Sequence, residues 1–328
     1  MLWLTQVQHH RRHHHHHPNP SKQQQQTGKD AKWFHRVKAN ATFDQLQHLL
    51  ADCCCRLNAL NKVNCVAELA PQKASSSSMA KPSTEKFVLH SRLDQDSLSA
   101  VVTLSGERVV QAEVSLKYAK SASGFYRATA QPEFHWKMQQ LMDAANSTVR
   151  ALHTLCQARK KYNECVQKGC GAAAAVAETD LHQFIFSVFN AIKADIKRGR
   201  LALTLPKKKS LVELCNFHPI KSFVPPLPHD ILLSFYISSA KIVCAAYQVA
   251  SAPAGTAPNG ARRGVPTAIA ATTMAQQQTV TIFQAECLVP RLVEIVHLLG
   301  TAFAIVHDFT ANFGLAIAHD GDTTLIDH

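Results

Sequence analysis

The chain has 328 residues, 46% of them hydrophobic, and can therefore bury the core of one or two domains. Its first apolar run is short and is followed by histidines and arginines instead of a cleavage site, which predicts a cytoplasmic protein without a secretory leader. Ten cysteines are present, but no CxxC pair occurs. The sequence therefore predicts reduced thiols and no structural zinc site.

The net charge of +12 is concentrated in two segments. Residues 1–38 hold seven Lys or Arg and one acid, and residues 193–209 also hold seven and one, so each segment contributes +6 and the remainder sums to zero. The second segment, KADIKRGRLALTLPKKK, could contact phosphate, a lipid surface or an acidic partner. It could equally be a solvated helix end, because Lys and Arg favour the last helical turn.

The amino-terminal part of the chain changes character near residue 29. Residues 1–28 are rich in His and Gln and are expected to be disordered, because they have little apolar surface to bury. Residues 29–70 are expected to form the first helix of a bundle. Its apolar residues are spaced three and four apart: Phe43, Leu46, Leu50, Cys53, Leu57 and Leu60. A Ser-rich linker, 72–84, follows.

A small β domain is predicted over residues 85–131. Ser105 and Gly106 mark the turn of a hairpin between two apolar arms. The second arm alternates strictly, which is typical of a half-buried strand. The residues predicted to share its buried face are Val110, Ala112, Val114, Leu116 and Tyr118.

Further bundle helices are predicted over 132–250. One apolar stripe contains Phe134, Met138, Leu141, Ala145, Thr148, Leu152 and Leu155, and a second contains Leu181, Ile185, Val188, Ile192 and Ile196. The short segment LALTLP is expected to be extended. The run PPLPHDILLSFYISSAKIVCAAYQV is predicted to be a central helix starting near Pro228, with Asp230 in its first turn. Lys241 leaves its uncharged part too short to span a membrane.

The final part of the chain is expected to contain a loop over 251–277, a strand over 278–286 that could join the β domain, and the last bundle helix over 287–313. The tail, 314–328, is not assigned to an element. Together these elements predict an α+β fold. In that fold, an elongated antiparallel helical bundle carries a small inserted antiparallel β domain.

No nucleotide-binding, nucleophile-elbow or zinc-protease motif occurs, so the sequence predicts no catalytic, cofactor-binding or metal-binding residue. One alternative is an enzyme that uses the acidic and histidine cluster at the carboxyl end, which includes His319, Asp320 and Asp322. The apolar seams instead favour a scaffold or adaptor.

Several blocks, in their order along the chain, resemble the Rogdi family of leucine-zipper-type proteins. They are KWFHRV with DQLQHLLADCCCRL, FVLHS with VVTLSGERVVQAEVSLKY, FHWKMQQLMDAANSTVRAL, LALTLP, the run from Pro225, and AECLVPRL. They cover roughly Lys32–Leu299, whereas 1–26, 72–84, 168–177 and the end after Val306 depart from the family pattern. The signature positions, all expected to be structural, are Trp33, Phe34, Leu46, Trp136, Leu205, Pro206, Pro228, Asp230, Tyr236, Glu286, Cys287 and Pro290.

The resemblance implies a non-enzymatic adaptor without a cofactor. The family is similar to the second subunit of the fungal RAVE complex. The resemblance implies two kinds of partner: large WD-repeat scaffold subunits of a RAVE- or rabconnectin-type complex, and V-ATPase subunits. It also implies a role in V-ATPase assembly and vesicle acidification. Family members are linked to neurons and synaptic vesicles, which implies a cytoplasmic location, peripheral on vesicle membranes, with the nuclear envelope as a further location.

An alternative is a nuclear or nucleic-acid-associated basic interaction protein, motivated by the isoelectric point of 9.3 and the basic segment 193–209. Binding to nucleic acid should weaken steeply with salt, because basic side chains displace counterions from phosphates. The family resemblance implies no DNA partner, and membrane association that is at most peripheral.

Overall fold

The structure is a computed structural model that describes residues 20–58, 84–91, 97–168, 174–217, 222–250 and 279–322. The chain divides into two compact units, Met1–Asp44 and Gln45–His328. In the first unit, helix α1 begins at Pro20, so residues 20–28 are helical and the prediction of disorder there is wrong. Residues 1–19 lie outside the described part. The sheet and the other helices belong to the second unit.

Five helices and nine strands are described. The helices are α1 (Pro20–Arg56), α2 (Gln139–Lys168), α3 (Ala174–Thr204), α4 (Leu211–Phe217) and α5 (Pro290–Asp322). The strands are β1 (Thr84–Ser91), β2 (Leu98–Ser105), β3 (Arg108–Lys117), β4 (Phe125–Ala130), β5 (Trp136–Lys137), β6 (Phe223–Val224), β7 (Ile231–Ser238), β8 (Lys241–Ala250) and β9 (Thr279–Leu288).

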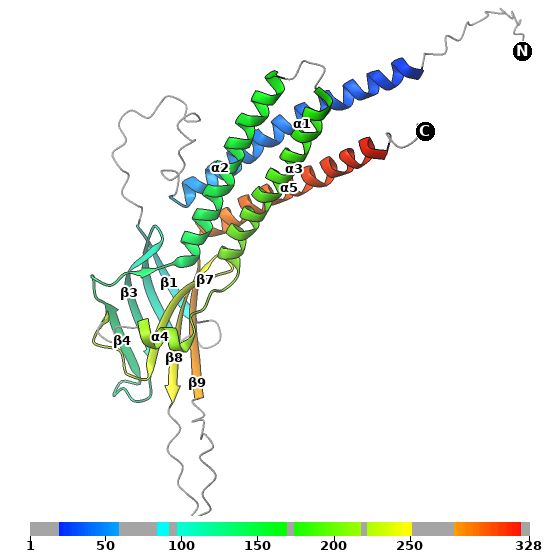
Figure 1. Ribbon diagram of the computed structural model, residues 1–328. Coiled ribbons are helices and arrows are strands. Elements are labelled where there is room, and N and C mark those ends of the chain that lie inside the picture. Colours follow the sequence, from blue (N-terminus) through cyan, green and yellow to red (C-terminus); the bar gives the residue numbers. More distant parts are fainter. Residues whose placement is uncertain are drawn as a thin grey trace, which may run out of the picture. The chain divides into compact units, whose positions relative to one another are not determined.

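All nine strands belong to one antiparallel sheet, curved into a half-barrel (Figure 1). The strand order is β6-β4-β3-β2-β1-β9-β8-β7, and β5 pairs with β3. The predicted fold class, a helical bundle with a small β insert, is therefore wrong. The sheet is a major layer because strands from the middle and the end of the chain join the predicted hairpin. The expectation that 278–286 joins the sheet is confirmed, since β9 pairs with both β1 and β8.

The hairpin at Ser105–Gly106 is confirmed as β2–β3, with Gly106 at a φ of 58°. Such a left-handed conformation favours glycine because a Cβ would crowd the backbone. A register shift between Thr103 and Leu104 moves the buried position from Val110 to Val109. The predicted face is therefore wrong at Val110, while the apolar residues beyond it face the core: Ala112, Val114, Leu116 and Tyr118.

The predicted central helix starting near Pro228 is wrong, because residues 231–250 form the antiparallel hairpin β7–β8. The turn residues Ser239 and Ala240 have φ values of 50° and 59°. Two consecutive left-handed residues form a tight hairpin turn that usually has the sequence Asn-Gly. Ser-Ala is unusual there, so the sequence did not indicate a turn. Both faces of β7 hold buried residues, including Leu233 and Tyr236. A strand covered on both faces loses the polar alternation that distinguishes it from a buried helix.

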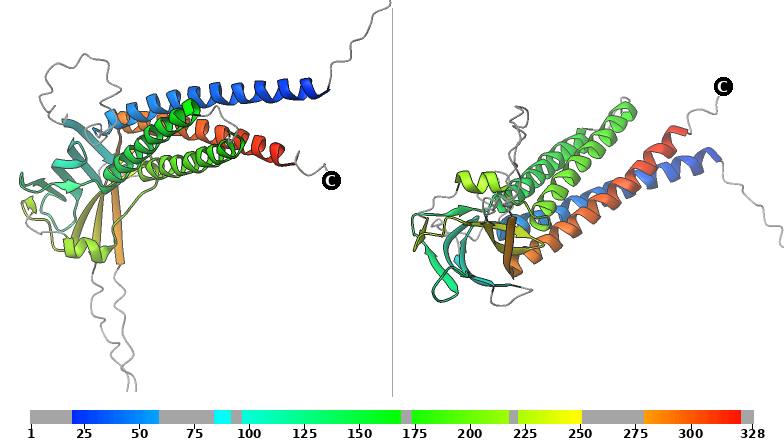
Figure 2. Two further views of the ribbon diagram at one scale, coloured as in Figure 1. Left: turned by 45° about the horizontal axis from the view of Figure 1, so that its top comes forward. Right: turned by 90° about the horizontal axis from the view of Figure 1, so that it is seen from below.

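The helices form a layer in which α2 packs along α3 and α3 along α5 (Figure 2). The predicted stripes lie at these contacts, and α3 buries Ile185, Phe189 and Ile192 almost completely. Two boundaries differ from the prediction. Helix α2 begins at Gln139, after strand β5, and α3 runs to Thr204, so most of LALTLP is helical instead of extended.

The last helix, α5, is confirmed and begins at Pro290, where a fixed φ and a missing N–H suit a helix start. Its segment Pro290–Asn312 is long and apolar enough to cross a membrane. A core helix meets the same criterion, and the stripe Leu292, Ile295 and Leu299 is fully buried. This stripe packs one face of the segment in the core, and 33% of its apolar window is buried. The helix extends to Asp322, while 323–328 and the predicted loop 251–277 lie outside the described residues.

Candidate interaction site

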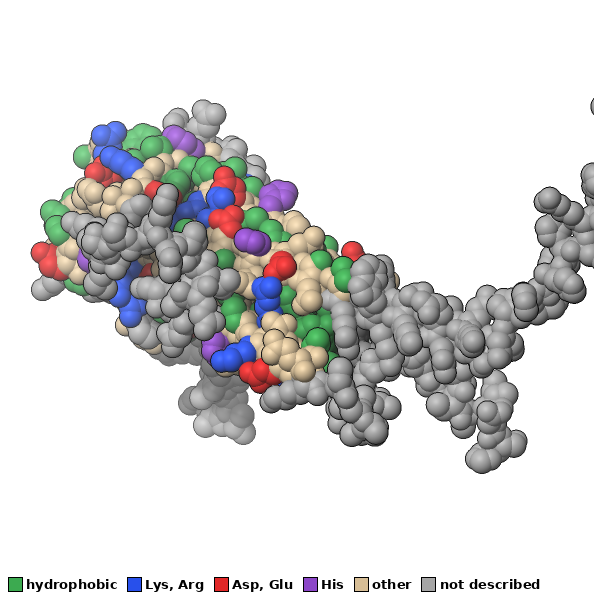
Figure 3. All heavy atoms as spheres, turned by 90° about the horizontal axis from the view of Figure 1, so that it is seen from above, with side chains coloured by type: hydrophobic (Ala, Val, Ile, Leu, Met, Phe, Trp, Pro, Cys, Tyr) green, Lys and Arg blue, Asp and Glu red, His purple; other side chains and the backbone are tan. Residues whose placement is uncertain are grey.

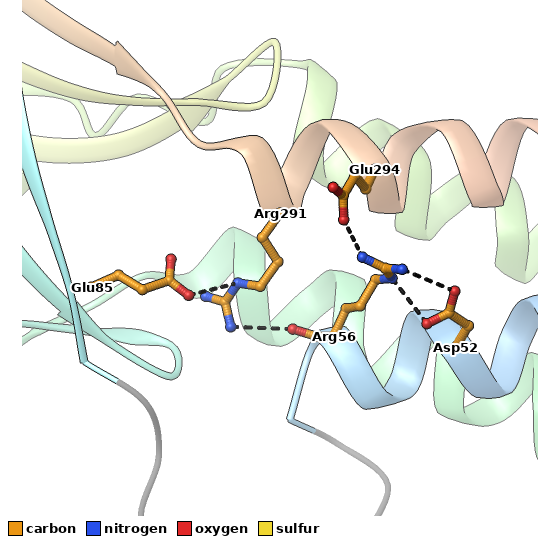
Figure 4. Close-up of polar contacts among 5 residues, drawn as sticks. All are labelled: Asp52, Arg56, Glu85, Arg291 and Glu294. Atoms are coloured by element: carbon orange, nitrogen blue, oxygen red, sulfur yellow. Dashed lines mark hydrogen bonds and ion pairs between the residues drawn. The ribbon is translucent and has the colours of Figure 1, made fainter.

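The end of α1, the start of β1 and the first turn of α5 meet at a cluster of charged side chains (Figure 4). Arg56 lies in the last turn of α1, where a cation is favoured by the helix dipole. Its Nε donates to Asp52 Oδ1 at 2.9 Å, and its Nη1 donates to Glu294 of α5. The hydrogen bond to Asp52 is the main reason that the pKa of Arg56 is raised.

Arg291 completes this cluster from α5. Its Nη1 donates to the main-chain carbonyl of Arg56 at 3.1 Å, and its Nε lies 3.4 Å from Glu85 Oε1 on β1. The last carbonyls of a helix have no partner within the helix, so Arg291 satisfies one of them. The signature residue Pro290 places Arg291 in the first turn of α5. We call these residues, Asp52, Arg56, Glu85, Arg291 and Glu294, the ionic junction.

A cleft of about 210 Å³ adjoins the ionic junction. It is lined by Leu57, Asn58, Gly106, Glu107, Leu141, Met142, Ala145, Arg291 and Leu292. Its ionisable lining residues are Glu107 and Arg291, and Arg291 is already engaged by Glu85 and Arg56. The lining thus combines amide, apolar and charged groups. It offers no nucleophile held against a general base.

A second polar cluster surrounds the signature residue Asp230 at the start of β7. Tyr118 Oη donates to Asp230 Oδ1 at 2.9 Å, and Lys120 Nζ donates to Oδ2 at 2.8 Å. Burial alone would raise the pKa of Asp230, but the hydrogen bonds from Lys120 and Tyr118 outweigh it, so the pKa is lowered. The carboxylate thus ties the segment after β3 to β7. The carbonyl of signature residue Pro228 accepts the N–H of Ile231 at 2.9 Å.

The other signature positions of the sheet are spread over both of its faces. The Trp136 ring lies 5.4 Å from the Phe235 ring on one face of β7. The buried Tyr236 lies on the other face, since successive side chains alternate. Glu286 accepts a hydrogen bond from Lys241 at 2.8 Å, and Cys287 is partly buried beside it in β9. The structure does not gather these residues into one cavity.

The signature positions of the helical part also lie apart. Leu46 is fully buried in α1. Leu205 and Pro206 are exposed where the chain leaves α3. Trp33 and Phe34 belong to α1, in the part whose side chains the structure does not describe.

Two of the buried cysteines, Cys53 and Cys244, are poor nucleophiles. Burial is the main reason that the pKa values of Cys53 and Cys244 are both raised to about 12. A neutral buried thiol packs as a small apolar group. Within the described residues, no group of three His, Cys, Asp or Glu side chains could hold a metal ion. The predicted alternative at His319, Asp320 and Asp322 lies outside the described side chains.

Much of the basic segment 193–209 makes contacts within the protein. Arg198 and Arg150 both donate to the buried Asp195, at 2.7 and 2.9 Å. Lys193 lies 3.1 Å from His307 Nδ1, and Lys207 lies 3.2 Å from Asp143. Side chains of both signs are interspersed on the described surface seen in Figure 3. These contacts favour the interpretation of the segment as a helix end over a continuous phosphate-binding stripe.

Gln140 joins α2, α3 and the sheet, and it was not predicted as a site residue from the sequence. Its side chain is 4% exposed. The carbonyls of Ala202, Leu205 and Ile237 lie 2.7 to 2.9 Å from its Nε2 and share its two N–H donors, and its Oε1 accepts the Ile237 N–H at 2.8 Å. The available signal was weak, because a glutamine in the first turn of a helix is usually exposed.

The described residues thus form a half-barrel sheet and a helical layer, with paired surface charges and neutral buried thiols at Cys53 and Cys244. Comparison with known proteins then identifies the family of the chain. Residues 30–294 match the family described as "Rogdi leucine zipper containing protein". The chain is 36% identical to the protein rogdi homolog of Caenorhabditis elegans over 84% of this chain and 83% of that protein. It is 31% identical to the protein rogdi of Drosophila melanogaster over 66% and 69%, respectively. The chain belongs to the Rogdi family.

Proposed function

We propose that this chain is a non-enzymatic adaptor subunit of a RAVE- or rabconnectin-type complex that promotes V-ATPase assembly and vesicle acidification, with a neuronal and synaptic role. The family match over residues 30–294 is the observation that carries the proposal. Its partners would be large WD-repeat scaffold subunits and V-ATPase subunits. Its location would be cytoplasmic, peripheral on vesicle membranes, with the nuclear envelope as a further location.

Affinity purification of the tagged full chain from native cells, followed by mass spectrometry, tests the proposal. We expect WD-repeat scaffold subunits and V-ATPase subunits to be recovered. Ile192→Asp should abolish recovery by placing a charge on the buried face of α3, whereas Asn190→Asp, exposed on the same helix, should not. Recovery of neither partner class with a folded, monodisperse sample would refute the proposal.

The nuclear or nucleic-acid alternative rests on the net charge of +12. The pairing of Arg150 and Arg198 with Asp195 weakens it, because these cations are already partly neutralised. A salt titration of binding to duplex DNA separates the two proposals. Binding that falls steeply with salt would favour the alternative, and absence of binding at low salt would exclude it.

A further inference from the structure

A second cleft, of about 260 Å³, lies along the outer edge of strand β7. Its lining includes Leu233 and Phe235 from one face of the strand and Ser234 from the other. Successive side chains of a strand point to opposite faces, so a cleft that reaches both faces lies at the strand's edge. Among the described strands, β7 pairs only with β8 and ends the sheet order.

The main chain of β7 turns hydrogen-bonding groups toward this cleft. The N–H and C=O of Ile237 point away from β8, because both bond to the side chain of Gln140. In an antiparallel pair, every second residue directs its main-chain groups to the same side. The N–H and C=O of Leu233 and Phe235 therefore face the cleft, whereas Gln140 occupies the position at Ile237.

Strand β7 has no protection of its sheet edge in its own sequence, although α2, α3 and α4 contact the strand and Gln140 covers its edge at Ile237. Natural edge strands carry charges, prolines or bulges that discourage pairing with another chain. The β7 sequence, ILLSFYIS, contains no charge and no proline, and its register with β8 is regular from Ile231 to Ser238. An edge of this kind is suited to the addition of one more strand.

The walls of the cleft are aromatic and its rim is basic. The Trp136 ring lies 5.4 Å from each of the Phe223 and Phe235 rings, and Trp136 and Phe235 are only partly buried. Exposed Lys137 and Lys209 border the cleft. Ser222 also lines it and is 1% exposed. Its Oγ has no hydrogen-bond partner in the described part of the structure, so a donor or acceptor of a bound chain would satisfy it.

We propose that the β7 edge binds an extended acidic segment of a partner protein by strand addition, with an apolar side chain of that segment packed against Trp136 and Phe235. The rim charges favour a partner with acidic flanks. The main-chain groups of Phe235, which is only partly buried, would supply the pairing hydrogen bonds, and those of Leu233, which is 2% exposed, would join them where the bound segment enters the cleft. This inference rests on the proposed adaptor function and adds to it the surface at which the adaptor would bind a partner.

Other occupants fit the basic rim less well. The three long undescribed segments of this chain are themselves basic: 1–19 holds two Arg and no acid, 59–83 three Lys and one Glu, and 251–278 two Arg and no acid. A second copy paired edge to edge would bring two basic rims together. Like charges in such contact oppose association.

A display library of random peptides, selected on the full chain, tests this surface while the partner is unidentified. Enriched peptides should combine an aromatic or aliphatic residue with flanking Asp or Glu. Lys137→Glu combined with Lys209→Glu should weaken their binding about tenfold or more. The matched control combines Lys86→Glu with Lys160→Glu, which makes the same charge change at exposed sites on β1 and α2. N-methylation of alternate peptide bonds should abolish binding, because it removes the donors for strand pairing.

Three results would refute binding at the β7 edge: no enriched peptide, equal binding by the rim variant, or insensitivity to N-methylation. A dimer that sediments as such and dissociates in the rim variant would also refute it, because a second copy would then be the occupant. Affinity purification separates this inference from the adaptor function. If the rim variant still recovers WD-repeat scaffolds and pump subunits, the adaptor function stands without this surface. If neither the unmodified protein nor the rim variant recovers these partners while the peptides bind as expected, the β7 binding surface is supported and the adaptor function is refuted.

Discussion

Replacing Gln140 by methionine would remove the amide that joins α2, α3 and β7 while keeping a similar volume. The Gln140 side chain is 4% exposed, shares its two N–H donors among the carbonyls of Ala202, Leu205 and Ile237, and accepts the N–H of Ile237. The change therefore tests whether one buried amide holds the edge of the half-barrel to the helices.

The expected loss depends on which main-chain groups can find water. Leu205 is exposed, so water can replace the amide at the end of α3. Ile237 is fully buried, and both its N–H and its C=O would lose their partner. Each orphaned buried group costs about 1–3 kcal/mol. With some gain from the buried methionine, we expect the free energy of unfolding to fall by about 3 kcal/mol.

Urea denaturation followed by circular dichroism measures this loss, and hydrogen exchange localises it. The Ile237 amide should exchange faster in the variant, because its acceptor is gone. Gln139→Met is the matched control, since the Gln139 side chain is exposed and donates to Asp143 within its own helix; it should change stability by less than about 0.5 kcal/mol. A Gln140→Met variant as stable as the control, with a protected Ile237 amide, would refute the reasoning.

Three further changes test other contacts. Asp230→Asn should lower stability at neutral pH by about 1–3 kcal/mol through weaker bonds to Lys120 and Tyr118. Because the folded pKa of Asp230 is lowered, its contribution is complete above the unfolded pKa of about 3.9 and is lost as pH falls through the folded pKa. Denaturation curves of both proteins should therefore converge in acid, and a gap independent of pH would contradict this. Arg291→Met should cost about 1–2 kcal/mol by uncapping α1, measured in urea; an unchanged midpoint would argue against the cap. Ile192→Ala should cost about 2–4 kcal/mol by leaving a cavity in α3, and a thermal melt matching wild type would argue against the burial.

The local patterns determined several elements without tertiary information. The hairpin at Ser105–Gly106 was predictable because its turn carries glycine and its arms alternate. The stripes of α3 and α5 were predictable because each helix buries one face only, as at Ile192 and Leu299. The Rogdi resemblance followed from the order of the blocks along the chain, and the family match over 30–294 confirms it.

The candidate sites were much less accessible from sequence. Arg291 and Arg56 are 235 residues apart, and a hydrogen bond over such a separation leaves no periodic pattern. Trp136 and Asp230 were selected as signature positions, but their contacts with Phe235 and Tyr118 emerged only from the folded chain. Gln140 and Ser222 were missed because isolated polar residues are usually exposed.

The amino-acid sequence by itself thus determined the family, the helices α3 and α5 that bury one face, and the β2–β3 hairpin. Each of these depends on neighbours within a short stretch. Only the tertiary structure decided that residues 231–250 form strands. Burial of both faces makes such a strand resemble a buried helix in sequence, and α4 with the half-barrel core provides that burial. The same long-range pairing made the sheet a major layer and left β7 at its edge. Edge position depends on which strands pair across the whole chain, and no local pattern records it.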